Sequence, residues 1–308
     1  MKFIITGATS FLGKALVRLL TRRGDEVVAI GRRDNSIFPD NVEYRSLNMD
    51  EYFRLTDVDK ADVFINLAWA GTGHEGRNNN DIQNKNIVDS LEAIRIAKIL
   101  GCRVFIESGS QAEYGLACEK TSEKTECNPI SEYGKAKLSL QKQAFELSRE
   151  LEISYVHLRI FSLIGEEDHE WTLVMSVIEA MLHGKQIGLT ACTQTWNFLY
   201  VADAAKMIYA ISKHFLKLPS CHQAIYNIAS DDTRPLKEFV EVIRKQDSSN
   251  GTCNYGAVRT NNLVSLNPDI NSYLSDIGNM EFTPYEEVIK KIIQSKNTTQ
   301  SNHYDKSL

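Results

Sequence analysis

Strand-like and helix-like segments alternate from the first residue of this 308-residue chain, and this alternation constrains the fold more than any other feature of the sequence. Short apolar runs that are typical of buried strands lie at 2–6, 26–30, 63–68, 104–108 and 155–159. Segments with helical periodicity lie between them, at 14–23, 84–100 and 131–151. The order indicates an α/β fold with βαβ units and a doubly wound parallel sheet, whose ligand site lies along the carboxyl ends of the strands.

The regular alternation ends near residue 165. Beyond it, the pattern predicts helices at 171–183 and 202–214, strands at 197–201 and 224–228, and a last helix near 284–294. The polar segment 246–256 is expected to be a loop, and the polar tail 295–308 is expected to be mobile. We therefore predict a main domain over 1–165, with returning segments near 197–214 and 224–230, and a smaller, interleaved C-terminal region over 166–308.

Charge, hydropathy and cysteine spacing argue against several classes of function. The net charge of −5 argues against a nucleic-acid partner, because no basic field exists to attract a polyanion. No stretch approaches the roughly 20 apolar residues of a membrane span, and the first apolar run ends at Gly7, too early for a signal peptide. The six cysteines form no CxxC pair and no histidine stands at metal-ligand spacing, so we expect no metal site. These features indicate a reduced, cytoplasmic setting.

Residues 7–13 join the first predicted strand to the first predicted helix. Gly7 permits a tight turn, and Gly13 lets the helix pack closely on the strand. The helix N-terminus presents free N–H groups and the positive end of its dipole, which suits a pyrophosphate. Ser10 stands where a further glycine is usual in such loops. In this context the loop predicts a dinucleotide site, and a turn without a ligand is the alternative.

Two arginines, Arg32 and Arg33, follow the second predicted strand. A carboxylate at that place would bind the ribose 2′-hydroxyl of NAD and repel a 2′-phosphate. Two guanidinium groups instead favour a phosphate, so NADP(H) is the favoured cofactor. NAD(H) stays an alternative because Asp34 lies close by in the sequence, and both arginines would then be solvated surface residues.

Tyr133 and Lys137 form a Tyr-x-x-x-Lys pair near the start of the helix predicted at 131–151. The spacing places the phenol and the ammonium on one helix face. Because the pKa of a free tyrosine is about 10, a nearby cation that favours phenolate would bring Tyr133 into the range of an acid–base catalyst. Ser110 follows the strand predicted at 104–108, where its hydroxyl can hydrogen-bond a substrate oxygen. Ser108 and Ser110 are alternatively loop-capping residues.

These segments together resemble the extended short-chain dehydrogenase/reductase family, in its NAD(P)-dependent nucleotide-sugar epimerase/dehydratase/reductase branch. The resemblance spans nearly the whole chain and rests on TGATSFLG, INLAWAG, QNKNI, SGSQAEYG, SEYGKAK, LRIFSLIG, WNFLYVADAA and YNIAS. It implies a Rossmann-type sheet that binds NAD(P), a smaller substrate-binding region, and a catalytic trio of Ser110, Tyr133 and Lys137. It also implies a cofactor site formed by Gly7, Ser10, Phe11, Leu12, Gly13, Arg32, Arg33, Leu67, Ala68, Asn86, Tyr133 and Lys137.

Several positions depart from the pattern of that family. In its 4,6-dehydratases an Asp-Glu pair follows the catalytic hydroxyl, whereas Gln111 and Ala112 stand there in this chain. Neither residue exchanges a proton at neutral pH, so dehydratase activity is not expected. Ser162 replaces the family's usual Asn, and Trp196 replaces its usual Arg, at places that often contact the phosphates of the sugar nucleotide. We expect the substrate to contact Gln111, Ser162 and Trp196 as well as the catalytic serine.

A glycine-rich loop after the third predicted strand carries Trp69, His74 and Arg77. Such a loop would overhang the substrate and bind its phosphates or sugar hydroxyls, and a solvated loop is the alternative. Arg259, in the C-terminal region, is either a further phosphate contact or a surface residue. His157, on the strand predicted at 155–159, is expected to be structural.

The leading hypothesis is an NADPH-dependent reductase of a nucleotide-linked keto-deoxysugar, in which Tyr133 is the acid, Ser110 holds the substrate oxygen and Lys137 tunes the phenol. The alternative is a nucleotide-sugar 4-epimerase that retains tightly bound NAD. A third hypothesis, a non-catalytic dinucleotide-sensing protein, is disfavoured by the intact trio. The sequence specifies neither the nucleotide nor the sugar. Homodimers formed through paired helices are common in the family, and we expect one here.

Overall fold

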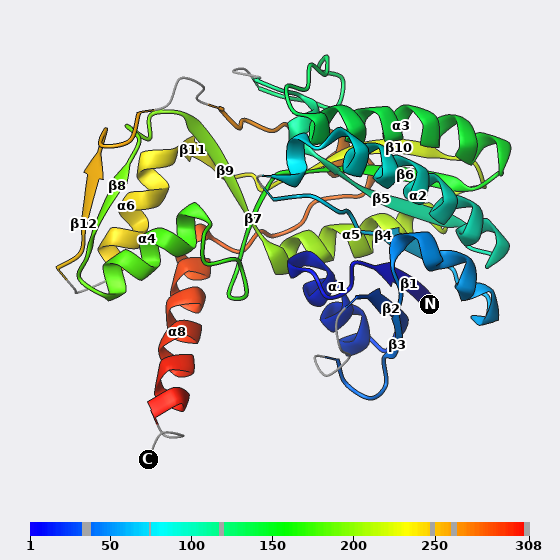
Figure 1. The fold of residues 1–308 in the computed structure, drawn as a ribbon, viewed down its shortest axis with the longest axis horizontal. Helices are drawn as coiled ribbons and strands as arrows, with labels where there is room; N and C mark the ends of the chain where they lie inside the picture. The colour runs from blue at the N-terminus through cyan, green and yellow to red at the C-terminus, as the bar shows by residue number, and fades with distance from the viewer. Residues whose placement is uncertain (33–37, 74, 117–119, 247–249, 260–263, 305–308) are drawn as a thin grey trace.

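The computed structural model describes residues 1–32, 38–73, 75–116, 120–246, 250–259 and 264–304. Its largest element is a seven-stranded sheet in which every neighbouring pair of strands is parallel (Figure 1). In spatial order the strands are β10 (Gln223–Ile228), β6 (Ser154–Ile160), β5 (Val104–Ser110), β4 (Val63–Asn66), β1 (Lys2–Thr6), β2 (Glu26–Gly31) and β3 (Glu43–Ser46).

Helices cover both faces of this sheet (Figure 1). One face carries α2 (Asn80–Ile99), α3 (Glu132–Glu150) and the 3₁₀ helix η1 (Met49–Asp57), and the other carries α1 (Phe11–Arg22) and α5 (Val201–Phe215). Neighbouring residues of a strand point to opposite faces, so Phe3 and Ile5 join the core beneath α1 while Ile4 joins the core beneath α2. Burial on both faces explains the near-continuous apolar strands and confirms the predicted α/β, doubly wound sheet.

The direction in which the chain adds strands reverses at β1. From this strand the chain continues to β2 and β3 on one side, and then crosses to β4, β5 and β6 on the other. The connections on the two sides run over opposite faces, which leaves a crevice at the carboxyl ends of β1 and β4. The loop at 7–13 and the segment at 67–69 directly follow these two strands, so they border the crevice.

The C-terminal part forms a second, smaller core at the left of Figure 1. It contains the helices α4 (Leu173–Leu182), α6 (Leu236–Gln246) and α8 (Tyr285–Tyr304) and the parallel strands β8 (Gln186–Leu189) and β12 (Thr252–Tyr255). A three-stranded sheet lies between this core and the main sheet, with β11 (Thr233–Pro235), β9 (Thr195–Tyr200) and β7 (Ser162–Ile164) in that order (Figure 1). The short helix α7 (Asn271–Asp276) contacts β10.

The chain crosses between the two parts more than once. After β9 it returns to the main sheet as α5 and β10, and then re-enters the smaller core as α6. The return begins at α5 rather than at residue 197, because β9 pairs with β7 and β11 and not with the main sheet. The division of the chain into domains near residue 165 stays a prediction.

Some predicted elements differ from those in the structure. The helix predicted from residue 14 begins at Phe11, because the Ser10 side chain caps it. The loop predicted at 246–256 is wrong at its end, where the polar strand β12 is held by backbone pairing to β8. Residues 295–304 of the predicted tail continue α8: no glycine or proline interrupts this stretch, and Lys296 pairs with Glu179 at 3.1 Å. The expected mobility of the tail stays a prediction.

Replacing Gly13 by Ala tests the packing at the crevice. A Cβ at this position would lie 2.2 Å from the Gly7 carbonyl oxygen, so backbone must shift to admit it. We expect Gly13→Ala to destabilise the protein by roughly 1–3 kcal/mol, measured as the urea midpoint of unfolding. Gly73→Ala is the matched control, because a Cβ there meets no heavy atom within 4 Å. Equal midpoints for the two variants would contradict this packing.

Candidate active site

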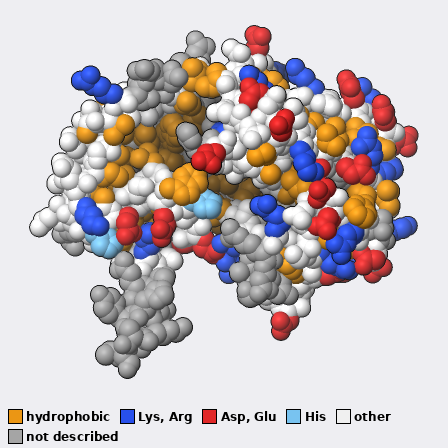
Figure 2. Space-filling model, in the orientation of Figure 1, with side chains coloured by type: hydrophobic (Ala, Val, Ile, Leu, Met, Phe, Trp, Pro, Cys, Tyr) orange, Lys and Arg blue, Asp and Glu red, His pale blue; other side chains and the backbone are white. Residues whose placement is uncertain are grey.

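A cavity of about 640 Å³ opens at the carboxyl edge of the main sheet, against the smaller core. Figure 2 shows a hollow between the two parts, walled largely by hydrophobic side chains. Among the predicted site residues, those that line the cavity are Ser10, Phe11, Leu12, Leu67, Trp69, Arg77, Ser110, Gln111, Tyr133, Lys137, Ser162 and Trp196. The structure therefore brings the predicted catalytic, cofactor and substrate residues to one place.

The loop after β1 has the close backbone contacts that a dinucleotide cradle needs. Gly7 adopts a positive φ of 62°, and a Cβ on it would lie 2.8 Å from the backbone of Leu67 and Ala68. Ser10 adopts an extended conformation that needs no glycine, and its hydroxyl accepts a hydrogen bond of 3.1 Å from the Gly13 N–H. The cradle is thus a glycine-lined turn ending at an open helix N-terminus, and the residues present fit a pyrophosphate.

Arg32 lies beside this cradle. A Cβ on the preceding residue, Gly31, would lie 2.8 Å from the Thr9 side chain, so the end of β2 contacts the loop directly. Arg32 itself is exposed and does not line the cavity. Arg33 and Asp34 lie outside the described residues.

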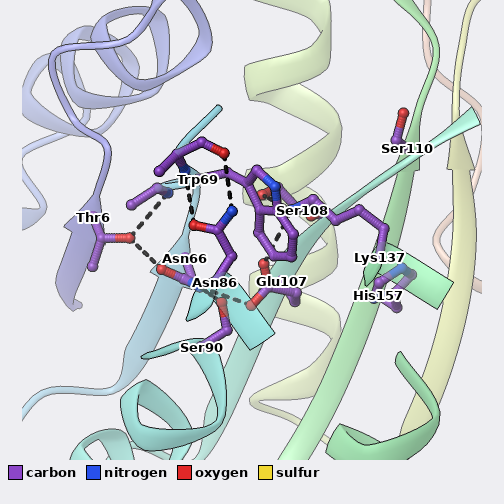
Figure 3. Close-up of polar contacts among 12 residues, drawn as sticks. Thr6, Asn66, Trp69, Asn86, Ser90, Glu107, Ser108, Ser110, Lys137 and His157 are labelled. Atoms are coloured by element: carbon purple, nitrogen blue, oxygen red, sulfur yellow. Dashed lines mark hydrogen bonds and ion pairs between the residues drawn. The ribbon is translucent and has the colours of Figure 1, made fainter. Parts of the chain in front are cut away.

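The segment after β4 is fixed by two amides of α2. The side chain of Asn86 both accepts from the Ala70 N–H and donates to the Ala70 carbonyl, each at 2.9 Å. Gln83 accepts a hydrogen bond of 2.8 Å from Trp69 Nε1 and donates to the carbonyls of Gly71 and Gly76. Asn86 therefore anchors the loop (Figure 3) and is not among the residues that line the cavity.

Trp69 and Arg77, from this loop, surround the predicted catalytic tyrosine. The Trp69 ring stands perpendicular to the Tyr133 ring, with centroids 6.1 Å apart. The Arg77 guanidinium lies over the Tyr133 ring, 4.3 Å from its centroid. His74, predicted to join them, lies outside the described residues. The contact of Arg77 with Tyr133 was not foreseen, because the loop conformation that creates it depends on Gln83.

The predicted catalytic trio is buried at the inner end of the cavity. Ser110 ends β5, and Tyr133 and Lys137 lie in the first turns of α3, whose N-terminus is capped by the Ser131 side chain. Burial raises the pKa of Tyr133, while hydrogen bonding to Ser110 and the charge of Arg77 oppose that rise. The Lys137 ammonium lies 6.0 Å from the Tyr133 ring centroid, and the expectation that it lowers the pKa of Tyr133 stays a prediction.

The Lys137 ammonium instead lies between Trp69 and the end of β5 (Figure 3). It donates a hydrogen bond to the Ser108 carbonyl, and it lies 3.5 Å from the centroid of the Trp69 ring. The nearby carboxylate of Glu107, with Oε1 3.7 Å from Nζ, was not predicted as a site residue. Burial lowers the pKa of Lys137 to about 8.

A second buried carboxylate, Glu113, fixes the backbone of Ser110 from behind. Its Oε1 accepts a 2.8 Å hydrogen bond from the Ser110 N–H and lies 2.9 Å from His157 Nε2, while its Oε2 accepts from Arg159 Nε at 2.9 Å. Burial alone would raise the pKa of Glu113, but its interactions with His157 and Arg159 hold this pKa below its ordinary value. His157 is fully buried in this cluster, as a structural residue would be. The sequence signal for Glu113 is its position three residues after Ser110, the spacing of a capping box.

The wall opposite the trio comes from the smaller core. Trp196 and Ser162 belong to it, and the buried Nε1 of Trp196 has no hydrogen-bond partner among the described residues. The segment between β7 and α4 adds Asp168, His169 and Trp171, which sequence reasoning missed. The Trp171 side chain is 75% exposed and stacks on His169 at the rim. Arg259 is exposed and does not line this cavity.

Two kinds of feature are absent from the described residues. No cluster of three or more His, Cys, Asp or Glu side chains there could hold a metal ion. Over the same residues, no helix is both long enough and apolar enough to span a membrane.

Comparisons with known proteins agree with this geometry. The model of the NAD dependent epimerase/dehydratase family matches residues 3–229. CDP-abequose synthase from Salmonella muenchen is 23% identical over 96% of this chain and 98% of its own length. UDP-N-acetylglucosamine 4-epimerase from Methanobrevibacter ruminantium M1, solved with UDP-N-acetylmuramic acid, superposes with a TM-score of 0.85, covering 97% of this chain and 98% of that one at 20% identity.

A further solved structure, MoeE5 in complex with UDP-glucuronic acid and NAD, superposes with a TM-score of 0.81 at 22% identity, covering 97% of this chain and all of that one. At such identities the superpositions establish the fold alone. The family match extends over most of the chain, from the first strand through β10. The chain therefore belongs to the NAD-dependent epimerase/dehydratase family, and it is an enzyme of the extended short-chain dehydrogenase/reductase type.

Proposed function

We propose that this enzyme is an NADPH-dependent reductase that acts on the keto group of a nucleotide-linked deoxysugar. The observation that carries the proposal is that Tyr133 and Ser110 line one cavity while Gln111 and Ala112, rather than an acidic pair, follow the serine. Burial raises the pKa of Tyr133, so the phenol keeps its proton at neutral pH, the state in which it can act as an acid. Gln111 and Ala112, which follow Ser110, cannot supply the acid–base pair that eliminates water.

The chain's own residues can hold the cofactor that this reaction requires. The helix N-terminus after Gly7 and Ser10 would bind the pyrophosphate, and the Arg32 guanidinium would bind a 2′-phosphate. When bound, the nicotinamide dinucleotide supplies the hydride. The preference for NADP(H) rests on Arg32, which directly follows Gly31, the residue that contacts the cradle at Thr9.

Tyr133 and Ser110 would then act on the substrate oxygen. The phenol donates its proton to that oxygen, and the Ser110 hydroxyl, on backbone fixed by Glu113, hydrogen-bonds it. Trp69 and the opposite wall of the cavity exclude water from the reacting atoms. Arg77, over the Tyr133 ring, stabilises the phenolate that remains after proton transfer.

The substrate wall supports a deoxysugar. Ile160, Phe161, Leu163 and Ile164 line the cavity, and such side chains suit a carbon that has lost its hydroxyl better than one that carries it. The similarity to CDP-abequose synthase, which extends over 98% of that protein, supports a nucleotide-linked sugar.

We also propose that the enzyme is a homodimer formed through α2 and α3. These helices pack against each other on one face of the sheet. On α2, Val88 and Ile99 are each 65% exposed, and their spacing of eleven residues places them on one helix face that a second copy would cover. A cytoplasmic location stays a prediction from the sequence.

Replacing Arg32 by Ala tests the cofactor preference. We expect the Kd for NADPH to rise roughly tenfold, as loss of one charge-assisted phosphate contact implies, while the Kd for NADH changes little. Titration calorimetry on the wild-type protein and on Arg32→Ala gives the Kd for NADPH and the Kd for NADH. The control is Arg95→Ala, since Arg95 is exposed on α2 and pairs with Glu92. Near-stoichiometric NAD released from the denatured wild-type protein would instead favour the 4-epimerase.

Replacing Tyr133 by Phe tests the acid. The variant keeps the ring and its packing but loses the proton, so we expect kcat to fall by about 10²–10⁴-fold with cofactor binding unchanged. Steady-state kinetics with nucleotide-linked keto-deoxysugars measure the loss. Tyr209→Phe, on α5, is the matched control and should keep full activity. An active Tyr133→Phe enzyme would rule out the proposed role.

A further inference from the structure

Glu107 is a fully buried carboxylate on β5, three residues before Ser110. Its Oε2 accepts a hydrogen bond of 2.8 Å from Asn66 Nδ2. Its Oε1 is also buried, and no described residue donates a hydrogen bond to it. This oxygen faces the Lys137 ammonium, with Nζ 3.7 Å away. A buried carboxylate with an unpartnered oxygen is costly, so its position next to a buried cation requires an explanation.

A polar frame holds the Glu107 carboxylate from the side away from Lys137. Asn66, at the end of β4, accepts a hydrogen bond from the Thr6 hydroxyl (Figure 3). Besides its bond to Glu107, Asn66 Nδ2 also donates to Ser90 Oγ at 3.2 Å. These residues come from β1, β4 and α2, and all are buried. The frame fixes one carboxylate oxygen and leaves the other directed at the ammonium.

The Lys137 ammonium has few other means of compensating its charge. It donates to the Ser108 carbonyl, approaches Ser108 Oγ at 3.4 Å, and lies against the face of the Trp69 ring. A carbonyl dipole and a ring offset only part of the cost of burying a full charge. Glu107 supplies the nearby negative charge, and it raises the pKa of Lys137 against the larger effect of burial.

Three phenols and one carboxylate around Glu107 keep one protonation state near neutral pH. Burial raises the pKa values of Tyr52 on η1 and Tyr155 on β6, and it also raises that of Tyr133, so these phenols stay neutral. Glu113, on the 3₁₀ helix η3 (Gln111–Glu113), has a lowered pKa and stays ionised.

The remaining ionisable groups contact these residues rather than Glu107 itself. His157 and Arg159, on β6, pair with Glu113, while Asp89 and Arg32 act on Tyr52. Burial raises the pKa of Glu107 to about 7 and lowers that of Lys137 to about 8. The pKa values shift in opposite directions and Oε1 lies 3.7 Å from Nζ, so we expect the two groups to titrate as a coupled pair.

We propose that Glu107 is a positioning residue: its carboxylate, fixed by Asn66 and 3.7 Å from Nζ, holds the Lys137 ammonium in its charged form at the inner end of the cavity. This inference extends the proposed function, because the protonation of this pair sets the charge beside Tyr133 during the reaction.

The test uses the ring of Trp69, which lies 3.5 Å from Nζ, as an optical probe of the Lys137 charge. The chain has three tryptophans, and Trp171→Phe with Trp196→Phe leaves Trp69 as the sole emitter. We expect the emission of this parent protein, without cofactor or substrate, to titrate near pH 7–8, where the pair loses protons. Lys137→Met should abolish the transition.

Glu107→Gln in this background removes the negative charge and should move the Lys137 transition at least about one pH unit lower. Glu107→Asp keeps the charge on a shorter side chain, so its midpoint should lie between those of the Gln variant and the parent. If the Gln variant does not fold, the Asp variant replaces it in the test. Ser90→Ala is the matched control, because it removes a hydrogen bond of the same frame without touching Lys137. We expect its midpoint to equal that of the parent.

Two results would overturn the inference: a midpoint that is unchanged in Glu107→Gln and in Glu107→Asp, or a transition that persists in Lys137→Met and so belongs to another group. Neither result depends on substrate, so a failure here is distinguishable from a failure of the reductase proposal. In the wild-type background, the pH limb of kcat/KM should move with the fluorescence midpoint in Glu107→Gln. A merely structural role would lower the rate at every pH without moving that limb.

Discussion

The contact on which the site depends is the one between the turn after β1 and the backbone after β4. At Gly7 a Cβ would come within 2.8 Å of the Leu67–Ala68 backbone, and at Gly13 it would come within 2.2 Å of the Gly7 carbonyl oxygen. This packing brings the N-terminus of α1 to the point where the strand order reverses. Strand β4 pairs with β1, β5 pairs with β4, and α3 packs against β5. The positions of Ser110 and Tyr133 at the carboxyl edge of the sheet therefore depend on the same packing.

Two buried carboxylates lie behind the residues that line the cavity. Glu107 and Glu113 are both fully buried, yet their environments differ. Glu113 has a histidine and an arginine as partners and stays ionised, whereas Glu107 has one buried lysine and an elevated pKa. The first carboxylate fixes the Ser110 backbone, and the second, on our proposal, adjusts the charge of Lys137. Two carboxylates six residues apart thus perform different tasks because of what surrounds them.

The sequence predicts the sheet, the cradle and the trio because these depend on local patterns: apolar runs, a glycine turn and an i, i+4 pair. It does not predict contacts made by residues far apart in the chain. The role of Glu107 depends on Asn66 and Lys137, which are contributed by β4 and α3. Strand β12 is not predicted from the sequence for the same reason, since it pairs with β8, which lies far from it in the chain. Helix α6 is different: Leu236, Phe239, Val240 and Ile243 have helical spacing and are buried, so the omission was an error of interpretation.

The most direct test of the central claim follows the hydride. The enzyme is incubated with dinucleotide deuterated at C4 of the nicotinamide and with nucleotide-linked keto-deoxysugars, and the sugar product is analysed by mass spectrometry and NMR. A reductase places one deuterium on the former carbonyl carbon of each product molecule, in step with oxidation of the dinucleotide. A sugar that is isomerised without net oxidation of the added dinucleotide, and that carries no deuterium, would contradict the account and identify an epimerase.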